Sequence, residues 1–340
     1  MKKLAILILA VLFIIPSFPQ NKTEESGGKF SGYMFGDYYY FIDNHNNDLK
    51  DEHGFWFRRI YFTYDYKINS SFSTRLRLEM ADKFNFENAQ TIVPFIKDAW
   101  LKYKFSKQAV IIGISPTPTW DRIEHIWGYR SVEKTPLDLQ KMGSSRDFGV
   151  SLKGQLDKKG MFKYQVMVGN SSGNKQEIDK GKSAMLSLAV YPTKNFVVEA
   201  YGDVANKNAK NWETFQGFAA YVTKKFRAGV QYAYQSREIN SNSDQLLRLA
   251  SFFVVGALSD QFSLLGRVDR NFDANPKGEG ISYIPFAQVK NTFFVGGLDW
   301  HPVKGVSFIP NIEYIAYDDV NGETPTNDVI ARITFYWKFK

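Results

Sequence analysis

The chain has 340 residues and a formal charge of +8, and it contains no cysteine. Disulfides, thiolate metal sites, iron–sulfur clusters and cysteine nucleophiles are therefore excluded. Aromatic residues make up 16% of the sequence although the mean hydropathy is only −0.33, which points away from disordered chains and helical bundles. With four histidines and a dilute positive charge, we expect no zinc site, no cofactor and no nucleic-acid partner.

The first twenty residues have the features of a secretory signal peptide. Lys2 and Lys3 precede an apolar run from Leu4 to Ile15, which is too short to span a membrane as a helix. The run has no polar face, which argues against the alternative of an N-terminal core helix. We expect an exported chain in which residues 1–20 are the signal peptide and residues 21–340 form one domain.

From Lys29 onward, apolar residues recur at every second position over segments of about 10 to 14 residues. In the last segment Val329, Ile333 and Phe335 fall on one face of a strand, and Arg332 and Thr334 fall on the other. A tilted strand needs about 9 to 11 residues to cross a bilayer. Period and length together indicate membrane-spanning strands with one face toward lipid and the other toward water.

Sixteen such segments are present, and the gaps between them alternate between tight turns and longer loops. Bacterial barrels have an even strand number, and an open sheet edge in hydrocarbon would leave unpaired backbone groups. A soluble β-sandwich would alternate too, but its loops have no reason to alternate in length. We predict an all-β fold, a closed antiparallel transmembrane β-barrel of about 16 strands with short periplasmic turns and longer external loops. The segments begin near residues 29, 54, 71, 92, 108, 145, 160, 183, 195, 213, 225, 245, 261, 288, 305 and 327.

Strand parity assigns each charged side chain to lipid or lumen. Arg58 and Arg146 have lipid-facing parity, near strand ends where a cation costs little. Pro310 predicts a bulge or irregular pairing. Thirteen basic and eight acidic residues have lumen parity, and such an excess favours anions, although each charge could equally brace the wall by pairing across strands. The basic set is Arg59, Arg75, Arg77, Lys102, Lys104, Lys153, Lys163, Arg227, Arg237, Arg248, Arg267, Arg332 and Lys338, and the acidic set is Glu79, Asp98, Asp147, Glu199, Asp203, Asp269, Asp299 and Glu313.

The longest gap, residues 119–144, is the third external loop and contains Trp120, Ile123, Ile126 and Trp127. These side chains are costly to leave in water, so the loop folds against something apolar. It either folds inward onto the wall, or it forms a surface lid or subunit contact. Folded inward it narrows the pore, and its basic side chains offer donors to a passing oxyanion. The constriction residues are then Arg122, Glu124, Trp127, Arg130 and Lys134, with Glu133 as a further balancing charge.

The sequence contains none of the catalytic motifs that we considered. No nucleophile elbow, phosphate loop or His-Glu-x-x-His pair occurs, so we assign no catalytic residue and no metal ligand. The acidic segment 43–52 lacks the ordered spacing of a calcium loop. A lipid hydrolase would need serine and histidine together on a lipid-facing strand, yet His45, His53 and His125 fall in expected loops and His301 at a turn.

Several short segments carry a family resemblance. They are Phe57-Arg58-Arg59, Arg75-Leu76-Arg77-Leu78-Glu79, Trp127-Gly128-Tyr129-Arg130, residues 144–150 and Lys153-Gly154, followed by an aromatic closing strand. In these the chain resembles the phosphate-selective porin O and P family, taken broadly. The resemblance implies a sixteen-stranded outer-membrane channel, a homotrimer, that passes small solutes with an anion preference. The chain departs from the family in lacking a ladder of basic residues dedicated to phosphate, and in ending on Lys340 rather than on an aromatic residue.

Together these features predict a porin of the bacterial outer membrane. Small hydrophilic solutes would diffuse passively through a hydrated lumen, with anions preferred and phosphate-like oxyanions among them. The expected partners are outer-membrane lipid, small anionic or polar solutes and further copies of the chain. The alternatives are a structural or adhesive barrel with an occluded lumen and an outer-membrane lipid hydrolase. The pore-lining, anion-binding candidates are Arg59, Arg75, Arg77, Lys102, Lys104, Arg227, Arg267 and Arg332.

Overall fold

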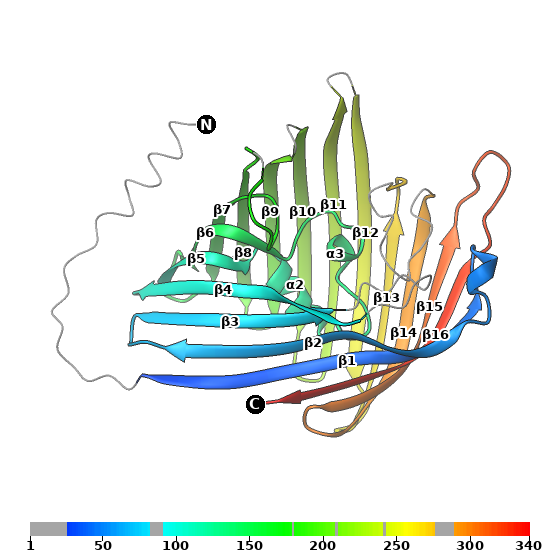
Figure 1. Ribbon diagram of the computed structural model, residues 1–340, viewed down its shortest axis with the longest axis horizontal. Coiled ribbons are helices and arrows are strands. Elements are labelled where there is room, and N and C mark those ends of the chain that lie inside the picture. The colour runs from blue at the N-terminus through cyan, green and yellow to red at the C-terminus, as the bar shows by residue number, and fades with distance from the viewer. Residues whose placement is uncertain (1–25, 82–90, 179, 208–209, 241–242, 276–288) are drawn as a thin grey trace.

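The computed structural model describes residues 26–81, 91–178, 180–207, 210–240, 243–275 and 289–340, so the expected signal peptide lies outside the described residues. Sixteen antiparallel strands form one closed barrel, each hydrogen bonded to its neighbours in the chain, and β1 pairs with β16 (Figure 1). The strands are β1 Gly27–Asp43, β2 His53–Lys67, β3 Phe72–Ala81, β4 Val93–Phe105, β5 Gln108–Pro116, β6 Arg146–Gln155, β7 Phe162–Gly169, β8 Ser183–Thr193, β9 Phe196–Lys207, β10 Lys210–Val222, β11 Phe226–Asn240, β12 Ser243–Ala257, β13 Phe262–Asn271, β14 Asn291–Val303, β15 Val306–Tyr317 and β16 Asp328–Phe339.

The barrel confirms the predicted fold class, and every predicted segment begins within three residues of an observed strand. Closure leaves the sheet without a free edge, so the β-sandwich alternative is wrong. None of the helices among the described residues is long and apolar enough to cross a membrane.

The two rims of the barrel differ in how they connect the strands. One, here called the short-turn rim, has connections such as 106–107, 194–195 and 304–305. The other, the long-loop rim, carries 44–52, which includes the 3-10 helix η1 (Asn47–Leu49), and also 117–145 and 318–327. The hairpins β9–β10 and β11–β12 are exceptions on the long-loop rim, because there the strands themselves extend and the connection is short.

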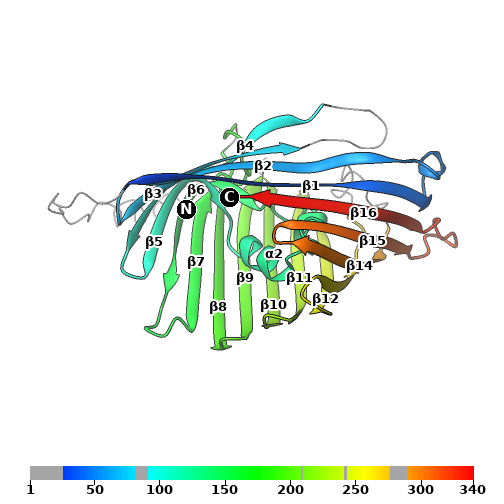
Figure 2. The same ribbon diagram turned by 90° about the horizontal axis from the view of Figure 1, so that it is seen from below.

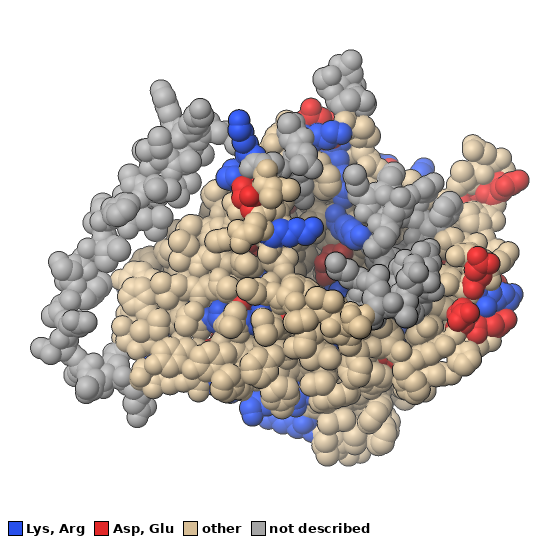
Figure 3. Space-filling view, in the orientation of Figure 1, with Lys and Arg blue, Asp and Glu red and all other residues tan. Residues whose placement is uncertain are grey.

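Apolar and polar side chains separate across the barrel wall as the alternation predicts. Ile333 is 50% exposed on the outside, and its neighbours Arg332 and Thr334 are buried on the inside. Uncharged side chains cover most of the outer wall formed by β1 to β4 in Figure 3. Outward aromatic residues such as Phe226, Phe262 and Trp300 lie close to the short-turn rim, where membrane barrels place their aromatic girdle.

Arg58 does not face lipid, and this corrects the parity prediction. The register runs from Phe35 opposite Arg59 to Gly36 opposite Phe57, so Arg58 is the extra residue of a β-bulge. The bulge resets the alternation, and two successive arginines then enter the lumen. Arg58 ion-pairs with Asp37 at 2.6 Å and is buried.

Two other strand predictions need revision, whereas the irregular pairing predicted at Pro310 is observed. Arg146, at the first position of β6, turns inward to Asp98 and is buried. Arg248 faces outward rather than into the lumen, because β12 is apolar on both faces and its inward residues include Leu247 and Leu249. Pro310 stays in register with β16, so no bulge forms there, although the pairing of β15 with β14 is interrupted beside it, as irregular pairing predicts.

Candidate functional site

The loop 117–145 enters the barrel, where it carries the helices α2 (Trp120–Trp127) and α3 (Pro136–Leu139). Figure 2 shows α2 inside the ring of strands. Ile123 and Trp127 are buried in an apolar cluster with inward side chains of β8 to β10 and β12 to β15. Gly128 ends α2 in the left-handed conformation, and a side chain there would collide with Arg227. The inward alternative is therefore the observed one, and the surface lid is wrong.

Wall arginines hold the main chain of this loop. We name Arg58, Arg227, Arg237, Arg267 and Arg332 the arginine clamp, because each donates to a carbonyl of the loop. Arg58 and Arg332 both bond Val132 O, at 2.8 and 3.2 Å, from adjoining sides of the β1–β2 and β15–β16 wall. The other three arginines, on β11 and β13, donate to the loop carbonyls of Trp127, Lys134 and Lys141. The loop has no strand ladder to pair with, so the clamp supplies donors to carbonyls that its own turns and helices leave open.

Most of the clamp is also ion-paired below the loop. Arg267 bonds Asp269 at 2.7 Å and Arg332 bonds Glu313, and both arginines are at most 5% exposed. Buried ion pairs need all their partners, because a lone buried charge is destabilising. Arg267 and Arg332 thus have the predicted parity, but they lie buried under the loop rather than in an open part of the lumen.

Glu133 joins this buried network from the loop side. Burial would raise its pKa, but Arg332 and Arg58 outweigh burial and hold the pKa below the ordinary value of 4.5. Its carboxylate lies 4.0 Å from Arg332. Together with Trp127, it is a loop residue that anchors rather than lines an open space, because both side chains are fully buried.

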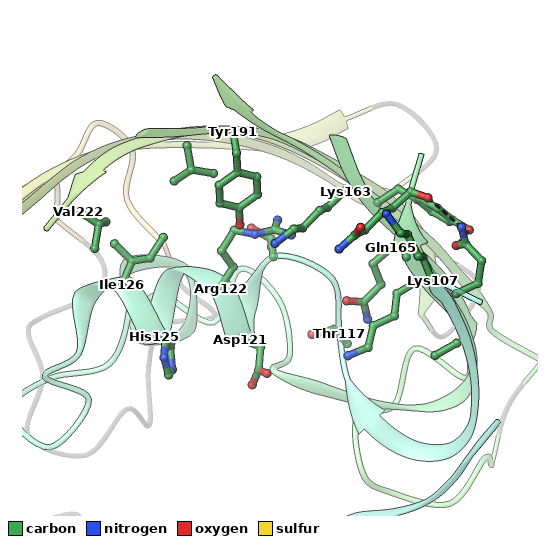
Figure 4. Close-up of a pocket in the computed structure, with 18 of the residues that line it drawn as sticks. Lys107, Thr117, Asp121, Arg122, His125, Ile126, Lys163, Gln165, Tyr191 and Val222 are labelled. Atoms are coloured by element: carbon green, nitrogen blue, oxygen red, sulfur yellow. Dashed lines mark hydrogen bonds between the residues drawn. The ribbon is translucent and has the colours of Figure 1, made fainter. Parts of the chain in front are cut away.

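The open part of the lumen lies between α2 and the short-turn rim. A cavity of about 910 Å³ there, which we call the lysine vestibule, is bounded by α2 and by strands β4 to β10. Arg122 of α2 and Lys163 of β7 point into the same space near Tyr191 (Figure 4). Asp121 is the one acidic residue among the described residues that line it. The basic residues of the lining are Lys102, Lys104, Lys107, Lys153, Lys163, Lys194 and Arg122.

Beside the vestibule, β2 and β3 carry three predicted arginines whose charges are partly matched. Arg75 bonds Asp65 at 2.7 Å, Arg59 bonds Glu79 at 2.7 Å and Arg77 lies 3.5 Å from Asp98. Their side chains are 17 to 26% exposed, so they remain part of the open wall. Arg75 and Lys102 both lie over the Trp100 ring, at 5.5 and 5.4 Å, which joins this wall to the vestibule.

The remaining predicted loop residues divide between two spaces. Arg122 bonds Glu199 and Ser187 at the vestibule wall. Arg130 lies 3.5 Å from Glu124, and both line a second cavity. Burial raises the pKa of Glu124, with Arg130 opposing. Burial also lowers the pKa of Lys134 to about 8.

Three lumen cations are not predicted by the sequence alternation. Lys107 and Lys194 lie in short turns, where alternation assigns no face, and both line the vestibule. Lys97 is the extra residue of a second bulge, between Arg77–Asp98 and Leu78–Ile96, and it bonds Glu79 at 2.9 Å. Among the described residues, no group of histidine, aspartate and glutamate is arranged to hold a metal ion.

No family model matches the sequence, and no curated protein matches it. Several solved structures are similar to it in fold. OmpT of Vibrio cholerae is similar at 13% identity with a TM-score of 0.63, over 93% of this chain and 99% of that one. An anion-selective porin from Comamonas acidovorans is similar at 10% identity and TM-score 0.67, over 93% and 100%. OmpF of Salmonella typhi, in complex with daunomycin, is similar at 10% identity and TM-score 0.65, over 92% and 97%. At such identities the likeness shows the fold, which is the sixteen-stranded barrel of outer-membrane proteins.

Proposed function

We propose that the chain is an outer-membrane porin through which small hydrophilic solutes diffuse, with a preference for anions. The observation that carries the proposal is the lysine vestibule, with seven basic residues and one acidic residue among its described lining. Rings of basic side chains lower the barrier for anions and raise it for cations. The apolar outer wall and its aromatic girdle support a membrane location, and export by the leader 1–20 belongs to the same proposal.

The mechanism is passage without covalent chemistry. The clamp fixes the loop, so α2 presents a constant wall to the vestibule. Lysine ammonium groups on flexible stems then attract an anion without gripping it, because they lack the planar fork with which arginine binds phosphate in a bidentate manner. We infer a general anion preference, with phosphate-like oxyanions among the solutes rather than as a dedicated substrate.

The assembly and the partners are part of the proposal. The wall would contact outer-membrane lipid, and the barrel would form a homotrimer. A trimer form of in-vitro folded OmpT of Vibrio cholerae, similar at 12% identity and TM-score 0.60, supports the trimer.

The test is the reversal potential of the purified protein in a planar bilayer across a KCl gradient. We expect a reversal potential whose sign corresponds to a preference for chloride over potassium. The double substitution Lys104→Gln with Lys153→Gln should shift the reversal potential toward the value expected for potassium preference. Lys225→Gln is the matched control, because Lys225 is exposed on the same rim and does not line the vestibule. A cation-selective wild type, or equal shifts in control and double variant, would contradict the anion preference.

An occluded structural or adhesive barrel is the second candidate, and the loop crossing the lumen favours it. The same bilayer experiment decides between the two, because an occluded barrel inserts without unitary current steps. The structure adds little support for the lipid hydrolase alternative, which needs a histidine beside a serine on the outer wall. The ring of His45 instead bonds Asp328 on the long-loop rim.

A further inference from the structure

A second cavity, of about 490 Å³, lies beside the lysine vestibule. Its lining comes from the loop and from β1, β11, β14, β15 and β16, whereas β4 to β10 bound the vestibule. Asp121 and His125 of α2 line both spaces, and in Figure 4 their side chains point away from Lys163 and Tyr191. Because α2 separates the two cavities, they can differ in chemistry.

Aromatic rings form one side of the second cavity. Tyr33 and Tyr336, on neighbouring strands, have ring centroids 6.1 Å apart, and Tyr33 also stacks on Tyr61 at 4.4 Å. Phe35 lies next along β1, with its ring 6.5 Å from that of Tyr33. We call this space the aromatic cavity. Flat apolar faces backed by other rings are surfaces on which a planar ring packs.

A buried carboxylate in the same lining has one oxygen that accepts no hydrogen bond from the described residues. Asp299 is 7% exposed, and its Oδ2 accepts from Tyr129 at 3.0 Å with His301 Nδ1 at 3.5 Å. Its Oδ1 has no hydrogen-bond partner among the described residues. A buried acceptor without a donor costs free energy, so a donor brought in by a solute would be favoured there.

Two cations line the same cavity, and one of them, Arg227, faces this carboxylate across Tyr129. The Arg227 guanidinium lies 5.3 Å from the centroid of the Tyr129 ring, whose hydroxyl holds Asp299, so opposite charges stand about one tyrosine side chain apart. Lys338 lines the same cavity from β16. Within the described part of the chain, neither cation forms an ion pair with a carboxylate. The other charges of the lining are Asp121 and the Glu124–Arg130 pair, which is closed at 3.5 Å.

We propose that the aromatic cavity is a weak binding site for ring-bearing zwitterions, that is, for aromatic α-amino acids. The ammonium group would donate to Asp299, the carboxylate would accept from Arg227 and Lys338, and the ring would pack on Tyr33 and Tyr336. The lysine vestibule offers an ammonium group almost only repulsion, so the two cavities select different solutes. The inference rests on the proposed channel function, because the solute reaches this cavity through the lumen.

The test uses the intact protein in a planar bilayer and follows how the ion current falls as L-phenylalanine is added. Phenylpropionate lacks the amine and phenethylamine lacks the carboxylate, so each probes half of the site. We expect L-phenylalanine to reduce the current at about tenfold lower concentration than either analogue, because a site built for two polar groups discriminates strongly against loss of one.

Asp299→Asn removes the charge but keeps the shape, and it should raise the half-blocking concentration of L-phenylalanine to that of phenylpropionate. Lys338→Met, near the rim, gives a second variant that does not depend on the buried Asp299. Lys225→Gln, which lines neither cavity, is the control and should leave the L-phenylalanine block unchanged. Equal block by the three compounds, or block unaffected by both variants, would overturn the inference while anion-selective current still upheld the porin. Absence of any current would instead remove the proposed function itself.

Discussion

The arginine clamp and the lysine vestibule are both basic regions of one lumen, yet they use their charges differently. Clamp side chains such as Arg267 and Arg332 are buried, and they are consumed by carboxylates and loop carbonyls. Vestibule lysines such as Lys104 and Lys153 line a large open space and have few anionic neighbours. A count of inward charges therefore overstates what a solute meets. The charge that a solute meets is carried by the side chains that are not already bonded to the protein's own carbonyls and carboxylates.

The strongest test of this division is removal of one clamp charge. Arg332→Met leaves Glu313 and Glu133 buried with fewer partners and should lower the free energy of unfolding by about 3 to 5 kcal/mol. Arg248→Met, at an exposed pair on the outer wall, is the matched control and should change little. Urea unfolding of the two variants in detergent measures the difference, and equal losses would mean that the clamp is not a buried network.

Release of the loop from the wall should have an effect of similar size, seen in the current. Trp127→Ala leaves a cavity in the apolar cluster, with a cost of about 3 to 5 kcal/mol, so the loop should detach and the unitary conductance should rise. Trp300→Ala, with its side chain on the outside, is the control for loss of an indole. If the conductance is unchanged in both variants, Trp127 does not position the loop.

Acid should loosen the clamp by a smaller amount. Arg332 and Arg58 hold the pKa of Glu133 below its ordinary 4.5, so its stabilisation is present above that pH and is lost as the pH falls below it. We expect protease sensitivity of the loop to increase over that window. Glu133→Gln should be equally sensitive at pH 7 and at pH 3, whereas a pH dependence matching wild type would assign the effect to another group.

Salt should affect the vestibule and spare the clamp. At an ionic strength of 1 M the screening length falls to about 3 Å, so exposed lysines lose their reach while buried pairs keep theirs. Anion preference should decline from low to high KCl at constant gradient ratio, with urea stability nearly constant. A stability that declines along with the selectivity would show that both regions are equally hydrated.

Sequence periodicity predicts this fold well, because nearly every strand of the barrel alternates between apolar side chains on the outer face and polar side chains on the inner face. The alternation of Arg332, Ile333 and Thr334 needs no tertiary information. It fails where one residue is inserted, as at Arg58 and Lys97, and where both faces are apolar, as around Arg248. Those failures are local, and they change the face of single side chains rather than the topology.

The candidate site was harder to predict, for a different physical reason. Parity places Arg267 and Lys153 on the same face, but it carries no information about depth or about what covers a side chain. The loop's aromatic content predicts burial, yet the positions of its carbonyls follow only from the fold. Which arginines the loop consumes is therefore a tertiary property.

The loop that crosses the barrel also acts mechanically. It contacts β2 and β16 through Arg58 and Arg332, and it also reaches β13 through Arg267 and β11, far around the ring from β2, through Arg237. A hollow cylinder of single-sheet thickness flattens readily under side-on load, and a segment bonded to distant strands resists that flattening. The segment 117–145 thus ties together strands that lie far apart around the ring, and the barrel cannot flatten across this line without breaking those bonds.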